Sequence, residues 1–421
     1  MNRRKFALGA AAATGVMLVK PATAFGYQAN SAVRLGLLGC GNRGSSVATS
    51  FAKNTSARVV AVADLFADNL AAGRERFSQL NATLGQPAIE EKLAFRGPRA
   101  FEKLAHSPDV DLVQISTPPF FHVEHLETVV AAGKHVYCEK PVGIDVKQAQ
   151  HALGIAKKVK ADQSVAVGFQ CRNAPPLAAV AERIKSGALG KVVSVVGNYN
   201  APASTEKKRE GEDADEYRLR NWLWDRALSG DILVEQNIHI IDLCNWMLGA
   251  HPAKAMATGG RSVLTHPGNC WDHYEVNYEY PGGVHLSFTS TQFGADGFDA
   301  GLKFYGSEGM ATAPYSGPVH VVGAHPWVWD DAARPAAAPA QFAANGAFSD
   351  NLQFADREKE RSFIASITSG HPLNEIAAGM ETALSCMLGR MAGLTGKTVT
   401  WEELLAHGES YELGMDLKQF A

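Results

Sequence analysis

A short glycine-rich segment constrains the fold of this chain more than any other feature. The apolar run 33–38 is followed by the spacing Gly39-x-Gly41-x-x-Gly44 and then by a stretch with helical periodicity, while the next apolar run ends at Asp64. In such a strand–turn–helix unit the first glycine makes the turn, the second lets the backbone approach a pyrophosphate, and the third lets helix and strand pack closely. The helix N-terminus holds the phosphates. The order of strand, turn, helix and terminal acid therefore predicts dinucleotide binding.

The residue types around this turn indicate which dinucleotide it takes. Asp64 can accept hydrogen bonds from the ribose hydroxyls, and its charge would repel a 2′-phosphate. We therefore expect NAD, with NADP less favoured. The expected cofactor contacts in this part of the chain are Gly39, Gly41, Asn42, Arg43, Gly44 and Asp64.

Short apolar runs alternate with helical stretches through the first part of the chain. Such alternation is typical of a parallel sheet that is covered on both faces. We predict a Rossmann dinucleotide-binding domain over residues 31–172, whose further strands fall within 58–64, 111–117, 135–140 and 164–170.

After residue 172 the strand pattern changes. Residues 273–293 read as two alternating strands around Pro-Gly-Gly, which is a hairpin signature, and residues 301–313 indicate another hairpin. We predict a substrate-binding α/β domain over residues 173–421, built on an open, mainly antiparallel sheet. The expected fold class is α/β plus α+β.

Composition narrows the range of partners. The formal net charge of −3 gives no electrostatic argument for nucleic acid or an anionic membrane as a partner. The six cysteines include no CxxC pair, and most lie in apolar segments. We expect reduced core cysteines rather than a disulfide framework, and no metal site.

The segment 1–24 has the three parts of an export signal. It contains Arg3 and Arg4, an apolar run over residues 6–19 that is too short to span a membrane, and Ala-Thr-Ala before residue 25. The paired arginines resemble those of a twin-arginine signal. We expect a periplasmic or otherwise exported protein that does not contact the membrane after signal cleavage.

A second motif lies at the end of a predicted strand. Glu139-Lys140-Pro141 follows the run HVYC, and side chains at the carboxyl edge of a nucleotide-binding sheet face the ligand crevice. A lysine there can hydrogen-bond a substrate hydroxyl and exchange a proton with it. We expect Glu139 and Lys140 to lie at the cofactor, with Lys140 also catalytic.

These motifs together resemble the glucose–fructose oxidoreductase / inositol dehydrogenase / rhizopine catabolism (Gfo/Idh/MocA) family. The likeness extends over nearly the whole mature length, and it rests on the loop 39–44, STPPFFH (116–122), AGKHVYCEKP (132–141), the stretch 230–249 and GLTGKTVTWEELL (393–405). It implies a sugar or polyol substrate held between the two domains. It also implies that Lys140 is catalytic or orients the substrate, and that Thr117, Pro118 and His122 meet the nicotinamide half of the cofactor.

The stretch 230–249 reads as a core helix with an unusual number of polar residues. The resemblance aligns Glu235 with a family Asp and His239 with a family His, and Asp242 also matches a family position. Spacings of four and three place these three on one helical face. We expect Glu235 and His239 to be catalytic and His239 and Asp242 to contact substrate. A satisfied core histidine and a Glu/His/Asp metal site are the alternatives.

Further candidates are weaker. Gln170, Arg172 and Trp222 could reach substrate hydroxyls or a sugar ring, and a structural role suits each equally well. The roles of Asp272 and His273 stay open.

Export has consequences for the reaction. Outside the cytosol an enzyme has no assured supply of free NAD, whereas a twin-arginine substrate can load its cofactor before export. We therefore expect an oxidoreductase acting on CH–OH groups of a sugar or polyol, with tightly bound NAD that is restored in the same site. The alternatives are an NAD-dependent glycoside hydrolase that works by oxidation, elimination and reduction, and a non-catalytic NAD-binding sugar sensor. By resemblance alone, a homodimer or tetramer is expected.

Overall fold

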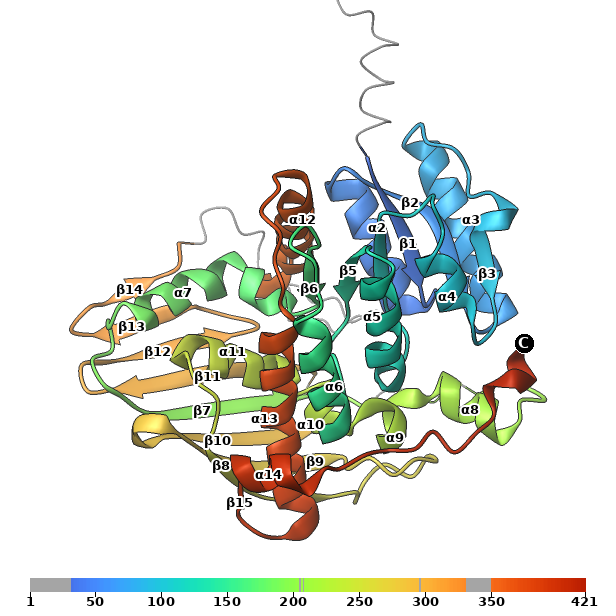
Figure 1. Cartoon of the computed structure of the whole chain (residues 1–421). Coiled ribbons are helices and arrows are strands. Elements are labelled where there is room, and N and C mark those ends of the chain that lie inside the picture. The colour runs from blue at the N-terminus through green and yellow to red at the C-terminus, as the bar shows by residue number, and fades with distance from the viewer. Residues whose placement is uncertain (1–31, 204–205, 207, 295–296, 331–349) are drawn as a thin grey trace, which may run out of the picture.

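A computed structural model describes residues 32–203, 206, 208–294, 297–330 and 350–421. The predicted signal 1–24 lies outside these residues. Two sheets organise the chain, and helices lie between them and around the first sheet (Figure 1). No helix among the described residues has the length and apolar character needed to cross a membrane.

The first sheet is parallel throughout, in the strand order 3-2-1-4-5-6 of a Rossmann fold. Its order is β3 (Ala94–Arg96), β2 (Ala57–Asp64), β1 (Val33–Leu38), β4 (Leu112–Ile115), β5 (His135–Cys138) and β6 (Val165–Val167). The helices of this domain are α2 (Asn42–Asn54), α3 (Ala67–Thr83), α4 (Ala100–Ala105), α5 (His122–Ala131) and α6 (Val146–Ala156).

The apolar runs form buried strands, as their composition requires. Every residue of β4 and β6 is buried, and so are five of the six residues of β1. Strands covered on both faces need apolar side chains at successive positions rather than at alternate ones. The predicted Rossmann fold is confirmed.

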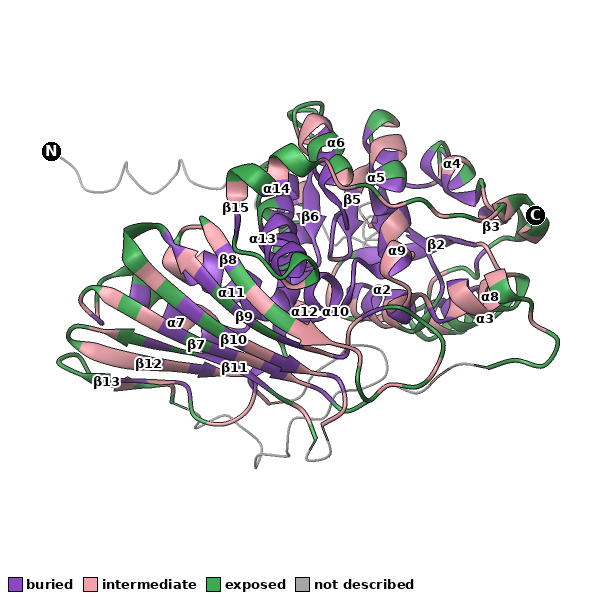
Figure 2. Ribbon diagram, turned by 90° about the horizontal axis from the view of Figure 1, so that it is seen from below, coloured by how far each residue is buried: buried purple, intermediate pink, exposed green. Residues whose placement is uncertain are grey.

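Within the described residues the second sheet has nine strands, and it is antiparallel except where β7 and β10 run parallel. Its order is β14 (Trp327–Val328), β13 (His320–Gly323), β12 (Gly309–Pro314), β11 (Asp299–Gly306), β7 (Val192–Asn200), β10 (Val284–Thr291), β9 (His273–Tyr280), β8 (Lys254–Gly260) and β15 (Val399–Thr400). Burial alternates along β9 and β10, so these strands are striped in Figure 2. One face is packed and the other is open, which confirms the predicted sheet.

The remaining helices lie on the packed side of this sheet, at the junction, or at the Rossmann domain. They are α7 (Pro175–Lys185), α8 (Ala214–Arg220), α9 (Arg226–Ser229), α10 (Ile232–Glu235), α11 (Ile238–Leu248), α12 (Ala355–Thr368), α13 (Ile376–Thr395) and α14 (Trp401–His407). Both α12 and α13 return to the Rossmann domain, where α13 packs on α6 and α12 on α2 (Figure 1). A bridge between Val165 and Asn374 adds to the edge of the parallel sheet. Residues after 173 therefore contribute to the packing of the Rossmann domain as well as forming the second sheet.

The stretch 230–249, expected as one helix, is divided into α10 and α11. Asp231 begins α10 with a positive φ of 79°, and its carboxylate caps the N–H of Ile232. The N–H of Asn237 donates to the carbonyl of Ile232, five residues back, at 3.0 Å. This wider turn separates the two helices. The spacing of four between Glu235 and His239 therefore does not correspond to one turn of a continuous α-helix.

Candidate active site

The three glycines of the turn satisfy three different geometric demands. Gly39 has a φ of +93°, and a Cβ there would lie 2.5 Å from the carbonyl oxygen of Ser116. A Cβ on Gly44 would lie 2.1 Å from the carbonyl oxygen of Gly39, so helix and turn can approach closely only with glycine. By contrast, a Cβ on Gly41 would meet no atom within 4 Å, because Gly41 faces a cavity. This free cradle above the N-terminus of α2 fits a pyrophosphate.

Asp64 lies at the carboxyl end of β2, beside that cradle. Its carboxylate accepts backbone N–H groups of Cys40 at 2.8 Å and Phe66 at 2.9 Å. Burial raises the pKa of Asp64, and these hydrogen bonds oppose the rise. The carboxylate lines the cavity, where its remaining lone pairs can accept ribose hydroxyls.

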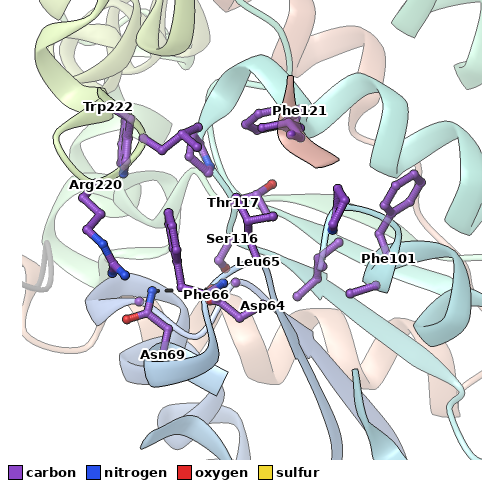
Figure 3. Close-up of a pocket in the computed structure, with 18 of the residues that line it drawn as sticks. Asp64, Leu65, Phe66, Asn69, Phe101, Ser116, Thr117, Phe121, Arg220 and Trp222 are labelled. Atoms are coloured by element: carbon purple, nitrogen blue, oxygen red, sulfur yellow. Dashed lines mark hydrogen bonds between the residues drawn. The ribbon is translucent and has the colours of Figure 1, made fainter. Parts of the chain in front are cut away.

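The cavity itself has a volume of about 370 Å³ (Figure 3). It extends from the glycine turn past Asp64 to Thr117 and Pro118, so these predicted cofactor residues come together. The cavity is also lined by four residues that were not predicted from the sequence: Leu65, Phe66, Phe101 and His125. The signal for the first two was available, since they directly follow Asp64 at the strand end. Figure 3 shows Trp222 and Arg220 approaching from α8 and the turn after it. Trp222 therefore lies at the nucleotide cavity rather than at the predicted sugar site.

Arg43 and Glu139, two other predicted cofactor contacts, are engaged with protein instead. The Arg43 guanidinium donates to Glu139 at 3.0 Å and binds Asp356 of α12 with two contacts of 2.8 Å. Neither Arg43 nor Glu139 lines the cavity. We assign both to a junction that ties α2, the end of β5 and α12 together.

His122 likewise lies behind the cofactor cavity. It is buried, and its two ring nitrogens each lie 2.7 Å from a carbonyl oxygen, those of Pro141 and Thr117. Burial lowers its pKa to about 4, and a neutral imidazole donates to one of these carbonyls at a time. His122 thus braces the loops after β4 and β5. Its direct contact with the nicotinamide stays a prediction. His125, whose Nδ1 lies 3.1 Å from the Thr117 hydroxyl, is the histidine that reaches the cavity.

Lys140 and Glu235 meet at the junction of the two domains. Lys140 Nζ lies 2.6 Å from Glu235 Oε1 and 2.6 Å from the Glu235 carbonyl oxygen. The side chains are only 12% and 10% exposed. Two of the three ammonium donors are therefore directed at one residue, and a third donor remains that could reach a substrate hydroxyl.

His239 stands near this pair on α11. Burial lowers its pKa far below the usual range, and the charges of Lys140 and Arg43 lower it further, so the ring is neutral at pH 7. The Cys171 thiol lies 3.9 Å from Nδ1 and 3.1 Å from the Tyr315 hydroxyl. Burial raises the pKa of Cys171 to about 12, so the thiol keeps its proton. A thiol that donates to Nδ1 leaves the proton of the ring on Nε2.

Two residues predicted to contact substrate, Asp242 and Arg172, instead bind each other. Asp242 is fully buried, and Arg172 binds it through two contacts of 2.8 and 2.5 Å. The hydroxyl of Thr382 adds a third contact to Asp242 at 3.0 Å. The carboxylate of Asp242 is thus engaged by protein, and we assign it to positioning α11 rather than to substrate. Gln170 is also buried, but its Oε1 has no hydrogen-bond partner within the described part of the chain.

Asp272 and His273 form a structural corner. Asp272 accepts the backbone N–H groups of residues 262, 263 and 264 at 2.7–2.9 Å and contacts His273 Nδ1 at 2.7 Å.

All six cysteines are buried and free, as expected. Within the residues that the structure describes, no group of three or more His, Cys, Asp and Glu side chains is arranged to hold a metal ion.

The glycine cradle and Asp64 beside the cavity are typical of a dinucleotide site, and the chain also holds a buried Lys140–Glu235 pair. Together these features indicate a dinucleotide-dependent oxidoreductase. Residues 33–169 match the family described as oxidoreductase family, NAD-binding Rossmann fold, and residues 177–312 match the GFO/IDH/MocA C-terminal domain. The chain belongs to the Gfo/Idh/MocA family of oxidoreductases, and its cofactor is NAD.

Individual relatives agree with this assignment. The chain is 27% identical to an inositol 2-dehydrogenase from Rhizobium meliloti (strain 1021), over 69% of this chain and 78% of that protein. A levoglucosan dehydrogenase in complex with NADH and levoglucosan shares the fold, with a TM-score of 0.67, 18% identity, and coverage of 87% of this chain and 99% of that one. So does an aldose-aldose oxidoreductase from Caulobacter crescentus, with a TM-score of 0.67 at 19% identity over 88% and 99% of the two chains. The predicted enzyme class, a sugar oxidoreductase of the Gfo/Idh/MocA type, is confirmed.

Proposed function

We propose that this protein oxidises a CH–OH group of a sugar or polyol at Lys140, and that its NAD is held tightly and restored in the same site. The observation that carries the catalytic part is the buried contact of 2.6 Å between Lys140 Nζ and Glu235 Oε1. Bound NAD would supply the hydride acceptor for the substrate carbon. The glycine turn, Asp64, Thr117 and Pro118 would hold it.

The proton of the substrate hydroxyl needs a base. Movement of the Lys140 proton to Glu235 leaves a neutral amine, which accepts the hydroxyl proton as the carbonyl forms. His239 donates from Nε2 to the same substrate oxygen and holds the reacting carbon in place. Because its imidazole is neutral, His239 orients the substrate and Lys140 serves as the base.

Unpartnered polar atoms support a polyhydroxylated substrate. Gln170 Oε1 and Gln236 Oε1, together with both side-chain polar atoms of Asn237, are buried without hydrogen-bond partners among the described residues. Gln236 and Asn237 directly follow Glu235, and Gln170 precedes the Cys171 that contacts His239. Buried polar groups of this kind cost free energy unless a ligand or water pairs with them. Sugar hydroxyls supply both donors and acceptors for them.

We propose internal recycling of NAD because of the predicted twin-arginine leader. We propose export by this route with the cofactor already loaded, followed by oxidation of one sugar and reduction of another. The solved relative from Caulobacter crescentus is described as an aldose-aldose oxidoreductase. We also propose a homo-oligomer, on the resemblance to the family.

A second candidate is glycoside cleavage by oxidation, elimination and reduction. Glu235 favours it, since the family resemblance aligns this carboxylate with a shorter Asp, and the longer side chain could take a proton from a carbon next to the transient carbonyl. The Lys140–Glu235 pair opposes a purely sensory role, because a sensor needs no proton relay.

One experiment separates these functions. The purified mature protein is denatured, and the released nucleotide is identified and counted per chain. Near-stoichiometric NAD(H) supports recycling, whereas an empty protein that needs millimolar NAD contradicts it. Sugar pairs and aryl glycosides then distinguish dismutation from cleavage, and Lys140→Ala should retain the nucleotide but lose turnover. Activity in Lys140→Ala would refute the proposed mechanism.

A further inference from the structure

The last part of the described chain, residues 411–420, lies outside the α-helices and strands and ends in a short 3-10 helix (Leu417–Phe420); we call it the strap. Along its first eight residues partly buried and exposed positions alternate: Tyr411, Leu413, Met415 and Leu417 face inward, and Glu412, Gly414, Asp416 and Lys418 face outward. A period of two is the pattern of an extended chain laid on a surface with one apolar side. The strap is thus packed along its length.

The strap is held at its beginning by the Rossmann domain. The N–H of Lys147 donates to the carbonyl of Glu409 at 3.1 Å, and the N–H of Tyr411 donates to Asp145 at 2.9 Å. Further on, the guanidinium of Arg218 in α8 contacts the carbonyl of Leu413 at 3.4 Å. Figure 1 shows the segment leaving α14, running below α9 and α8, and ending near β3 on the opposite side of the molecule.

The strap ends at the nucleotide cavity. Leu417 lines the cavity directly, and the ring of Phe420 packs edge-on against Phe66 with centroids 5.5 Å apart. A separate small apolar cluster forms here, distinct from the main core. Its members from outside the Rossmann sheet are Leu219, Trp222, Leu228, Leu413, Met415, Leu417 and Phe420, and they pack on Leu65, Phe66, Phe120 and Phe121.

Helix α8 closes the same end of the cavity from the other side. The guanidinium of Arg220 lies 3.8 Å from the centroid of the Phe66 ring and pairs with Asp68 at 3.0 Å and with Glu216 at 2.7 Å. Arg209 also pairs with Asp68. These arginine contacts lower the pKa of Asp68 to about 2, so the attachment is charged across the neutral range. Two elements outside the Rossmann sheet therefore meet over Phe66, which lies two residues after Asp64, the residue expected to bind the ribose.

We propose that the strap and α8 form a built-in retaining wall for the adenosine half of the cofactor, so that the nucleotide leaves only when the strap is displaced. The proposal takes NAD in this cavity from the proposed function, and it assigns Leu417 and Arg220 as cofactor-binding residues. The wall is contributed by the same chain, and it leaves the Lys140 side of the site untouched. Retention can thus be slow while substrates exchange freely at the other end.

Release kinetics test the wall directly. Protein loaded with NADH is mixed with a large excess of NAD, and the loss of bound-NADH fluorescence gives the release rate. The double variant Leu417→Ala/Phe420→Ala should release NADH at least tenfold faster than the unmodified protein. Lys418→Ala, an outward-facing change in the same segment, is the matched control and should leave the rate unchanged. Equal rates in all three proteins would overturn the proposal.

A second measurement avoids any dependence on the folding of the variants. Amide hydrogen exchange of residues 411–420 in the unmodified protein should slow at least tenfold when NADH is bound, and exchange in the open sheet face of β12 and β13 should not change. Unaltered exchange in the strap would count against the wall. If turnover requires added NAD, the proposal of internal recycling fails. The strap proposal is still supported in that case, provided that the variants differ in their rate of NADH release.

Discussion

The buried pair of Lys140 and Glu235 allows a sharp test of whether the two residues act as one unit. The perturbations are Lys140→Met, Glu235→Gln and the double variant. The side chains are 12% and 10% exposed, so each single change leaves a polar or charged group largely out of water without its partner. Breaking such a pair costs about 3–5 kcal/mol, whereas removing both members costs far less than the sum. We expect a coupling free energy of about 2–3 kcal/mol.

The assay is urea unfolding at pH 7.5, followed by tryptophan fluorescence on nucleotide-free protein. The surface pair Lys254–Glu279 is a matched control, because its contact of 2.9 Å is similar but its side chains are 43% and 40% exposed. The cycle of Lys254→Met and Glu279→Gln should show no measurable coupling. If the changes in the free energy of unfolding are as additive at the Lys140–Glu235 pair as at the control pair, the two buried residues do not act as one unit.

Activity gives the second half of the same test. Loss of a positioned acid–base group costs about 10²–10⁴ in rate, so Lys140→Met should lose at least a hundredfold in kcat. The double variant should recover stability but not turnover, because the proton acceptor is still missing. A double variant with recovered kcat would show that the pair is structural and that the base lies elsewhere.

Three further predictions follow from particular contacts. Gly41→Ala should leave the unfolding midpoint unchanged but weaken NAD binding at least tenfold in titration calorimetry, because its Cβ enters the space of the pyrophosphate cradle. Gly44→Ala should in addition lower the free energy of unfolding by about 1–3 kcal/mol, because its Cβ would lie 2.1 Å from the carbonyl oxygen of Gly39. Burial raises the pKa of Glu360 from 4.5 to about 9, so the unfolded chain loses a proton that the folded chain keeps and stability falls as pH rises between these values. Glu360→Gln should therefore raise the free energy of unfolding at pH 7 by about 3 kcal/mol, and an unchanged pH profile in urea titrations would contradict this. Burial lowers the pKa of His122 from 6.5 to about 4, so its contribution is complete above pH 6.5 and is lost as pH falls toward 4. At pH 5 that loss amounts to about 2 kcal/mol, and urea titrations of His122→Gln should show a shallower decline in acid than the unmodified protein.

Local sequence patterns were sufficient for the fold. Continuous apolar runs, glycine turns and a Pro-Gly-Gly hairpin are decided by backbone sterics and by burial over a few residues, so β1, β2, β9 and β10 fall where the patterns place them. The same holds for the glycine cradle and Asp64, because all four residues belong to one strand–turn–helix unit and the end of the next strand.

Pairings between distant segments were beyond such reasoning. No local pattern shows that Arg43 meets Asp356, that Asp242 is taken by Arg172, or that Trp222 turns toward the nucleotide cavity. A polar side chain in a motif reads as a ligand contact until its partner is known, and the partner is supplied by packing of elements far apart in the chain.

The sequence by itself determined that this chain contains a dinucleotide turn, a parallel sheet, an open sheet and a lysine at a strand end, since each depends on neighbouring residues. Only the tertiary structure decided that Glu235 contacts Lys140 while Asp242 and His122 brace the site, and that residues 411–420 cross the molecule to the cofactor cavity. The physical reason is that burial and charge pairing depend on which surfaces meet, and those surfaces come from elements tens to hundreds of residues apart.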